Sequence, residues 1–167
     1  MKEIKWGFIG CGEVTEKKSG PAFNEVEGSQ VVAVMGRNEN KVRAYAEKHH
    51  IRKWYTDAQE LIDDPDVNAI YVATPPSSHA TYAIMSMNAG KPVYIEKPLA
   101  SSYEDCIRIN RVSEQTGVPC FVAYYRRYLP YFRYLYYLYY LYFVHLLFHF
   151  VGLFYHYFLH YFYFLHF

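Results

Sequence analysis

The ten residues from Trp6 to Thr15, WGFIGCGEVT, decide the fold of this chain. They begin as a short apolar strand, break at two glycines and then become compatible with a helix. Gly10 lets the backbone leave the strand in a tight turn, and Gly12 has no Cβ, so an anion can approach the main chain. The spacing predicts a phosphate-binding turn of the form G-x-G-x-x-T, with Thr15 in place of the usual third glycine. Taken alone, the same pattern also fits an ordinary strand-to-helix turn.

Strands and helices are expected to alternate after this turn. Continuous apolar runs are typical of strands buried on both faces, and turn residues separate them from helical segments. This alternation predicts an α/β fold with a doubly wound parallel sheet of six strands. After the opening strand, the expected strands are 30–35, 53–55, 69–73, 92–95 and 119–124, and the expected helices are 13–26 (interrupted at Gly20-Pro21), 39–49, 56–62, 102–116 and one that runs from a Ser77 or Ser78 cap to Ala89.

Composition excludes several functional classes. The formal net charge of +1 gives no electrostatic case for a nucleic-acid partner. The three cysteines, Cys11, Cys106 and Cys120, are odd in number and lack metal-ligand spacing. Buried, inert thiols in a reducing compartment are the simplest interpretation. No metal is therefore expected, and the N-terminus lacks a secretory signal pattern, so a cytoplasmic location is predicted.

Chemically useful residues follow five of the six predicted strands. Ligands of open parallel sheets bind beyond the carboxyl ends of the strands, and these ends share one edge. The residues at this edge are Gly10-Cys11-Gly12 with Glu13 and Val14 behind them, Arg37 with Asn38, Thr74-Pro75-Pro76, Glu96-Lys97-Pro98, and Tyr125-Arg126-Arg127. Their convergence is a stronger indication of a site than any one motif.

Arg37 lies about two dozen residues after Gly12, where a dinucleotide-binding fold places the residue that contacts the adenine ribose. Gly36 offers no carboxylate for the 2′-hydroxyl of NAD, whereas Arg37 could bind a 2′-phosphate through two charge-assisted bonds. NADP is therefore the expected cofactor. Glu39 keeps NAD as the alternative, and a solvated surface arginine is the alternative without function. Asn38 is also expected to cap the following helix.

Lys97 follows a buried strand and precedes a proline. At the sheet edge it could donate to a substrate hydroxyl or carbonyl, and burial would lower its pKa. Glu96 is its candidate ion-pair partner, and a purely structural pair is the alternative. The peptide bond before Pro98 is a candidate cis bond, which the sequence does not decide. His79, in the first turn of a helix, is by itself more typical of a surface or capping residue.

Six short segments, spread in order over the predicted strands, carry a resemblance to a known family: 7–12, 32–34, 73–79, 89–93, 96–98 and 124–127. Through them, residues 1–130 resemble the N-terminal domain of the glucose–fructose oxidoreductase, inositol dehydrogenase and rhizopine-catabolism (Gfo/Idh/MocA) family. The resemblance implies an NAD(P)-dependent oxidoreductase that acts on a sugar, a polyol or a related hydroxyl or carbonyl compound. It implies that Lys97 contacts the substrate and supports hydride transfer, and that Thr74, Pro75, His79, Glu96 and Arg126 line the cofactor. Pro76 belongs to the same rigid loop as Thr74 and Pro75, which is expected to flank the nicotinamide or the adenine ribose.

The second α/β domain of the family, with its catalytic histidine, substrate pocket and oligomer interface, is not recognisable in this sequence. The cofactor-binding part of an oxidoreductase is therefore the first functional hypothesis. A non-catalytic dinucleotide-binding module or a truncated fragment is the alternative. A homo-oligomer is left open by the resemblance.

Residues 131–167 differ in composition from the rest of the chain, because they consist almost entirely of Tyr, Phe, Leu and His. Arg133 is its only lysine, arginine or acidic residue. Three interpretations compete: a designed or poorly specified sequence, a helical arm, and a membrane segment, for which 143–159 is the nearest candidate. Histidines within that segment disfavour the membrane, as do tyrosines that are not confined to the two ends of a span. A helical tail of unknown role is expected.

Overall fold

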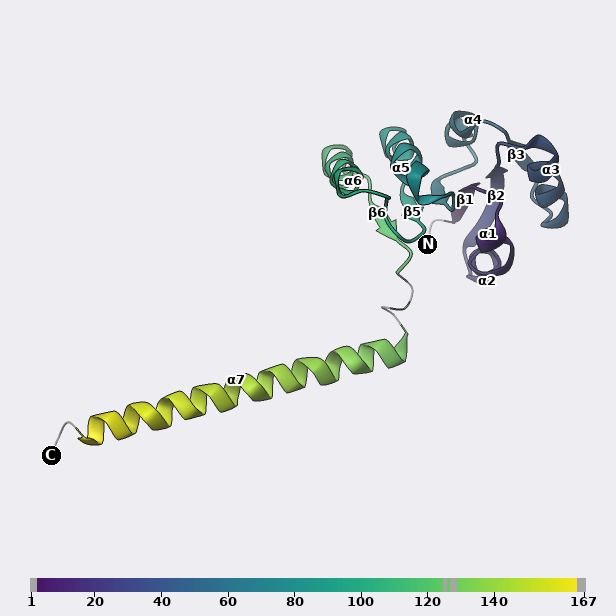
Figure 1. Ribbon diagram of the computed structural model, residues 1–167. Helices are drawn as coiled ribbons and strands as arrows, with labels where there is room; N and C mark the ends of the chain where they lie inside the picture. Colours follow the sequence, from purple (N-terminus) through teal and green to yellow (C-terminus); the bar gives the residue numbers. More distant parts are fainter. Residues whose placement is uncertain (1–2, 125, 127–128, 165–167) are drawn as a thin grey trace. The chain divides into compact units, whose positions relative to one another are not determined.

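The structure is a computed structural model that describes residues 3–124, 126 and 129–164, with side chains described as far as residue 153. It forms two compact units, Met1–Ala123 and Tyr124–Phe167. Figure 1 shows the first unit as a sheet flanked by helices and the second as one long helix.

All six strands of the first unit are parallel, as the sequence predicts. They lie in the order β3-β2-β1-β4-β5-β6. β2 and β3 extend the sheet on one side of β1, and β4, β5 and β6 extend it on the other side. The strand order therefore reverses between β1 and β4, which is where ligands of such sheets bind. The strands are β1 (Ile4–Ile9), β2 (Ser29–Met35), β3 (Lys53–Tyr55), β4 (Ala69–Val72), β5 (Val93–Ile95) and β6 (Cys120–Val122).

The helices occupy the predicted segments, and the first is broken as expected at Gly20-Pro21. Asn38 caps α3, since its side-chain oxygen accepts from the Lys41 N–H at 2.9 Å. The expected cap at Ser78 is wrong, because its hydroxyl lies 2.8 Å from Thr74 Oγ1 and 2.9 Å from the Pro75 carbonyl and accepts no capping bond. The helices are α1 (Glu13–Lys17), α2 (Ala22–Glu25), α3 (Glu39–Lys48), α4 (Ala58–Asp63), the 3₁₀ turn η1 (Pro76–Ser78), α5 (His79–Asn88) and α6 (Tyr103–Thr116).

Two apolar layers hold the sheet, one on each face. The helices α4, α5 and α6 bury Leu61, Met87 and Ile109 against one face. Phe8 and Tyr71, which are cross-strand neighbours, lie on the other face, in a cluster that includes residues of α3. Each fully buried side chain of this size contributes about 1.5–3 kcal/mol. The sheet is thus fixed from both sides, which keeps its carboxyl edge rigid.

The second unit contains the helix α7 (Pro130–Phe164), so the expected helical tail is present. Nearly all its described side chains from Tyr131 to Leu153 are exposed. The segment Pro130–Leu153 is long and apolar enough to cross a membrane by length and composition. Buried core helices of soluble proteins and signal sequences meet the same criterion, so length and composition alone do not assign α7 to a membrane.

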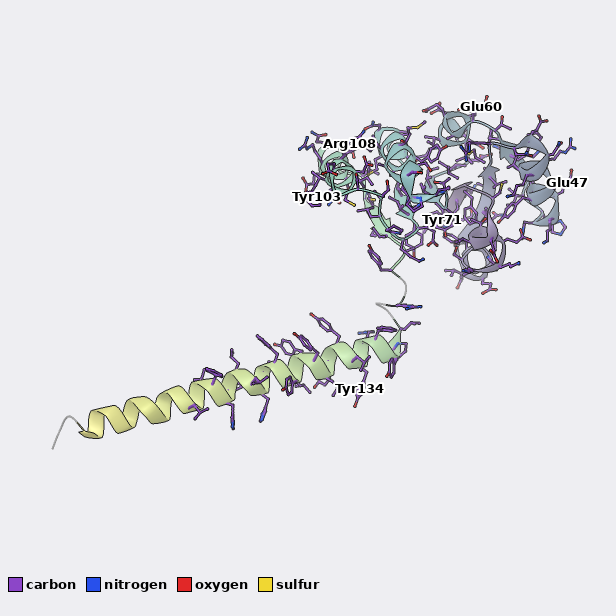
Figure 2. The ribbon with its side chains drawn as sticks, in the orientation of Figure 1. Glu47, Glu60, Tyr71, Tyr103, Arg108 and Tyr134 are labelled. Atoms are coloured by element: carbon purple, nitrogen blue, oxygen red, sulfur yellow. The ribbon has the colours of Figure 1, made fainter. Side chains whose placement is uncertain are left out.

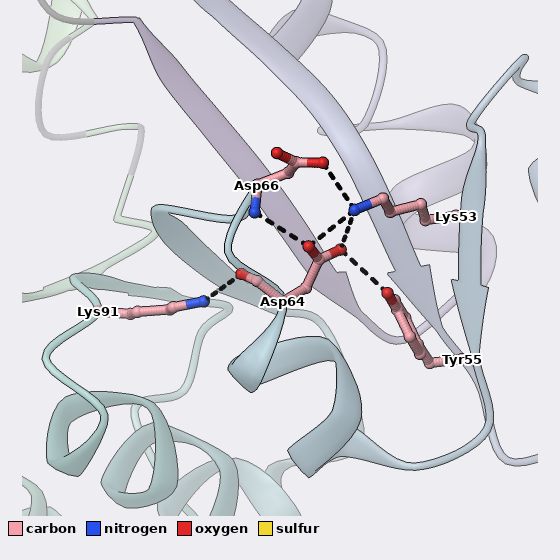
Figure 3. A network of polar contacts seen from close by, with 5 residues as sticks. All are labelled: Lys53, Tyr55, Asp64, Asp66 and Lys91. Carbon is pink, nitrogen blue, oxygen red and sulfur yellow. Dashed lines mark hydrogen bonds and ion pairs between the residues drawn. The ribbon is translucent and has the colours of Figure 1, made fainter.

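The buried residue Asp64 anchors the end of α4 through a network of polar contacts (Figure 3). Its carboxylate accepts from Lys53 Nζ at 2.8 and 2.9 Å, from the Tyr55 hydroxyl at 3.0 Å and from the Asp66 N–H at 3.0 Å. Its carbonyl accepts from Lys91 Nζ at 2.7 Å. Burial opposes ionisation of Asp64, but these donors outweigh it and hold the pKa of the carboxyl below its usual value.

Replacing Asp64 by Asn is expected to lower the free energy of unfolding by about 1–3 kcal/mol at about pH 7, because an amide has no charge to pair with Lys53 and offers the surrounding donors one acceptor oxygen in place of two. The carboxylate stabilises the fold fully above its unfolded pKa of about 4, and this is lost as the pH falls through the lower folded pKa. The difference from wild type should therefore shrink in strong acid. Urea unfolding followed by tryptophan fluorescence measures it, since Trp6 and Trp54 both lie in the first unit.

The exposed neighbour Asp63 provides the control, and Asp63→Asn should leave stability nearly unchanged. An Asp64→Asn penalty that stays constant down to about pH 2 would contradict the assigned role.

Candidate functional site

Three strand ends meet at the first glycine turn. A Cβ on Gly10 would lie 2.7 Å from the Ala73 carbonyl oxygen, so the turn passes directly against the end of β4. A Cβ on Gly36 would lie 2.6 Å from Cys11 Sγ, so the same turn also touches the end of β2. The residues predicted to share one edge of the sheet are therefore brought together there for β1, β2 and β4.

Gly10 and Gly12 have different roles in this turn. Gly10 has φ of +115°, a conformation that side chains rarely adopt, whereas a Cβ on Gly12 would meet no atom within 4 Å. Thr15, at the third position of the motif, is buried and donates from Oγ1 to the Gly12 carbonyl at 2.9 Å. Gly10 thus shapes the turn, Thr15 closes it, and Gly12 leaves its outer surface open to a ligand.

A cavity of about 480 Å³ lies beside the turn, between α1 and α3. Cys11 and Gly12 contribute to its wall, together with Lys41 from α3. Burial raises the pKa of the Cys11 thiol, and the Lys41 charge opposes this only in part. Cys11 therefore stays a protonated thiol, as expected for an inert residue. The other lining residues are Glu13, Glu16, Lys17, Ala44, Tyr45 and Lys48.

The residues that are predicted to contact the adenine ribose lie at the start of α3. Arg37 and Asn38 are both exposed. Because the Asn38 side-chain oxygen caps the helix, the Arg37 guanidinium is the better candidate to bind a phosphate. Lys41, one helical turn further on, adds a second cation. The sequence analysis missed Lys41, although its spacing of four from Arg37 was a usable signal.

His79 joins two loops and is not the surface residue that its position suggested. Its side chain is 1% exposed. Its Nε2 lies 2.8 Å from the Thr74 carbonyl oxygen, and its Nδ1 lies 2.9 Å from the Pro98 carbonyl oxygen. The ring therefore ties the loop after β4 to the loop after β5. Its expected contact with cofactor stays a prediction.

The Glu96-Lys97-Pro98 turn holds the predicted catalytic lysine, and its Lys97–Pro98 peptide bond is cis. Glu96 Oε1 accepts from the Tyr71 hydroxyl at 2.5 Å, and Oε2 accepts from the Lys97 backbone N–H at 3.2 Å. The expected ion pair between Glu96 and the Lys97 ammonium is absent from this described segment. Lys97 is exposed. Tyr71 was missed because a tyrosine within an apolar strand carries no local signal.

Comparison with known proteins assigns this site to a family. The family model for an oxidoreductase family with an NAD-binding Rossmann fold, Gfo/Idh/MocA, matches residues 4–124. The chain belongs to the Gfo/Idh/MocA oxidoreductase family. It carries that family's NAD-binding Rossmann domain, as the sequence resemblance implied.

Two curated relatives illustrate the likeness. An oxidoreductase from Formosa agariphila is 47% identical over 129 residues, which cover 77% of this chain and 40% of that protein. A D-xylose dehydrogenase from Paenarthrobacter nicotinovorans is 39% identical over 97 residues, which cover 58% of this chain and 25% of that protein. The chain therefore spans well under half the length of these relatives.

Two solved structures show the same fold with different nucleotides. A 3-ketoreductase from Actinomadura kijaniata in complex with TDP-benzene and NADP is 25% identical, with a TM-score of 0.75 over 80% of this chain and 41% of that one. An oxidoreductase from Agrobacterium radiobacter in complex with NAD⁺, L-tartaric acid and magnesium is 26% identical, with a TM-score of 0.69 over 75% of this chain and 36% of that one. Gfo/Idh/MocA-type folds therefore accept either nucleotide.

The last predicted site residues follow β6 in the second unit. Arg126 is described and exposed, and its contact with cofactor stays a prediction. Tyr125 and Arg127, which also carried the resemblance, lie outside the described residues.

Gly10 and Gly12 provide a matched pair of substitutions. Gly12→Ala should change the free energy of unfolding by less than about 0.5 kcal/mol, because its Cβ meets open space and its φ of −101° suits any residue. It should nevertheless weaken dinucleotide binding by about tenfold or more, since the new Cβ occupies the surface that a diphosphate must approach. Gly10→Ala should instead destabilise the fold by about 1–3 kcal/mol.

Urea unfolding and calorimetric titration with NADP and NAD measure the two effects. A Gly12→Ala variant that binds dinucleotide as tightly as wild type would exclude this turn as the phosphate site.

Proposed function

We propose that this chain is the cofactor-binding part of an NAD(P)-dependent oxidoreductase. When bound, the nicotinamide cofactor supplies the hydride acceptor or donor for a hydroxyl or carbonyl group of a sugar, a polyol or a related compound. The observation that carries the proposal is the open surface at Gly12, which lies where the ends of β1, β2 and β4 meet in a chain of this family. The D-xylose dehydrogenase among the relatives supports a sugar-like substrate.

The dinucleotide would lie across the carboxyl edge of the sheet. Its diphosphate would bind at Gly12, with the N–H groups of Glu13 and Val14 as donors. Its adenine ribose would lie at the start of α3, and its nicotinamide half at the loops after β4 and β5. The residues placed at these two ends are Arg37 and Asn38 for the ribose, and Thr74, Pro75, Pro76 and Glu96 for the nicotinamide.

Lys97 is the proposed catalytic residue. It follows Glu96 at the end of β5, beside the loop that would hold the nicotinamide, and its exposed ammonium is free to donate to a substrate oxygen. Such a donor holds the reacting carbon close to the nicotinamide and stabilises charge that develops on the oxygen.

A non-catalytic dinucleotide-binding module is the second candidate. One observation favours it: Lys97, the proposed catalytic residue, is exposed to solvent, and an exposed donor is poorly directed at a substrate oxygen. We also propose a cytoplasmic location, which three cysteines without disulfide bonds support, and a homo-oligomer as the assembly to be tested.

Arg37 is expected to make the site prefer NADP over NAD. Arg37→Ala should weaken NADP binding by about tenfold and change NAD binding by less than about twofold, because only NADP carries the 2′-phosphate. Arg43→Ala, which removes the same charge from an exposed position of α3, is the control and should change neither affinity. Equal affinities of the wild-type chain for the two nucleotides would refute the assignment of Arg37.

Turnover separates the two candidate functions. The full chain is mixed with NADP or NAD and a panel of sugars and polyols, and nicotinamide absorbance is followed. In an oxidoreductase, Lys97→Ala should abolish turnover while the dissociation constant of the dinucleotide changes by less than about twofold. Tight dinucleotide binding by the wild-type chain without turnover on any substrate would favour the binding module.

A further inference from the structure

Tyr71 is a buried tyrosine whose hydroxyl group is hydrogen-bonded to Glu96, a residue of the proposed site. It belongs to β4 and is fully buried. Figure 2 labels it within the first unit. Its ring is packed against Phe8 at 4.9 Å, Phe23 at 4.7 Å and Tyr94 at 5.7 Å between ring centroids. These contacts hold the ring without help from its hydroxyl, so the position of the hydroxyl is determined by packing.

The Tyr71 hydroxyl links two segments that flank the site. It lies 2.5 Å from Glu96 Oε1 and 2.6 Å from Ser19 Oγ, which follows α1. An ionised carboxylate only accepts hydrogen bonds, so Tyr71 donates its single proton to Glu96. Burial and the nearby carboxylate raise the pKa of Tyr71, which keeps that proton in place. The Tyr71 oxygen then accepts from Ser19, and the hydrogen bonds run from Ser19 through Tyr71 to Glu96.

This chain of bonds fixes one end of the proposed cofactor site and not the other. Glu96 Oε1 is held by Tyr71, and Oε2 is held by the backbone N–H of Lys97. The carboxylate is therefore held in one orientation by the Tyr71 ring, whose own position is fixed by packing in the core. The adenine end depends on residues that follow β2, with which the Tyr71 hydroxyl makes no described hydrogen bond.

We propose that Tyr71 is a positioning residue for the nicotinamide half of the dinucleotide, acting through the Glu96 carboxylate and supported by Ser19. The inference rests on the proposed function, because it assumes that the loop after β5 receives the nicotinamide half. It assigns a role in cofactor binding to a core side chain that does not itself reach the cofactor.

Tyr71→Phe isolates the hydroxyl, because the ring and its aromatic contacts remain. In the full chain, this variant should bind NADP about five- to tenfold more weakly than wild type, because the Glu96 carboxylate loses one of the two bonds that orient it. Its affinity for adenosine 2′,5′-bisphosphate, which contains only the adenine half, should change by less than about twofold. If wild type prefers NAD, the same comparison is made between NAD and AMP.

Tyr55→Phe is the matched control. It removes a tyrosine hydroxyl that donates to the buried Asp64 carboxylate at 3.0 Å, in the network at the end of α4. Both affinities should stay at the wild-type values in this variant, whatever its loss of stability. Ser19→Ala, which removes the donor to Tyr71, should weaken dinucleotide binding in the same direction as Tyr71→Phe but by less.

A double-mutant cycle with Glu96→Ala tests whether Tyr71 acts through Glu96. In the Glu96→Ala background, Tyr71→Phe should cause no further loss of dinucleotide affinity, so the two effects are not additive. Additive effects, or equal losses of affinity for the dinucleotide and its adenine half, would overturn the proposal. A wild-type chain that binds neither ligand would instead overturn the proposed function on which it rests.

Discussion

The close approach of the β1–α1 turn to the end of β4 is the constraint on which the site depends. A side chain at Gly10 would place its Cβ 2.7 Å from a backbone carbonyl, which cannot move without disturbing β4. A Cβ at Gly36 would lie 2.6 Å from the Cys11 sulfur, a side-chain atom, at the end of β2. Two missing side chains therefore let three strand ends converge, and the open surface at Gly12 is a consequence of that convergence.

Hydrogen bonds from buried polar side chains then fix the loops around this turn. Thr15 closes the turn itself, His79 joins the loops after β4 and β5, and Tyr71 joins the loop after β5 to the end of α1. Each of these side chains is at most 1% exposed, so loss of a partner would leave a buried polar group unsatisfied. The apolar layers hold the strands, whereas these three residues determine how the loops lie on top of them.

The sequence predicted the strands, the helices and the shared edge because these depend on local patterns. Apolar runs mark the strands, and the glycine spacing marks the turn whatever the rest of the chain does. It did not predict the roles of Tyr71 and His79, because their partners are remote: Tyr71 bonds to residues 52 and 25 positions away, and His79 bonds to one 19 positions away. Lys97 was placed correctly at the edge, but its exposure depends on what covers it, which no local pattern records.

Binding and catalysis place different demands on this structure. Dinucleotide binding needs a fixed turn, a cation near the ribose and oriented loops. For these roles, in that order, the first unit offers Gly12, Arg37 and the bonded Glu96 carboxylate. Catalysis also needs water to be excluded, because a donor exposed to solvent shares its hydrogen bonds with water and is poorly directed at a substrate oxygen. Lys97 is exposed in this chain, so the catalytic role proposed for it would need a second surface over the end of β5. Dinucleotide affinity therefore tests the residues of this chain directly, whereas turnover also tests whatever completes the substrate side.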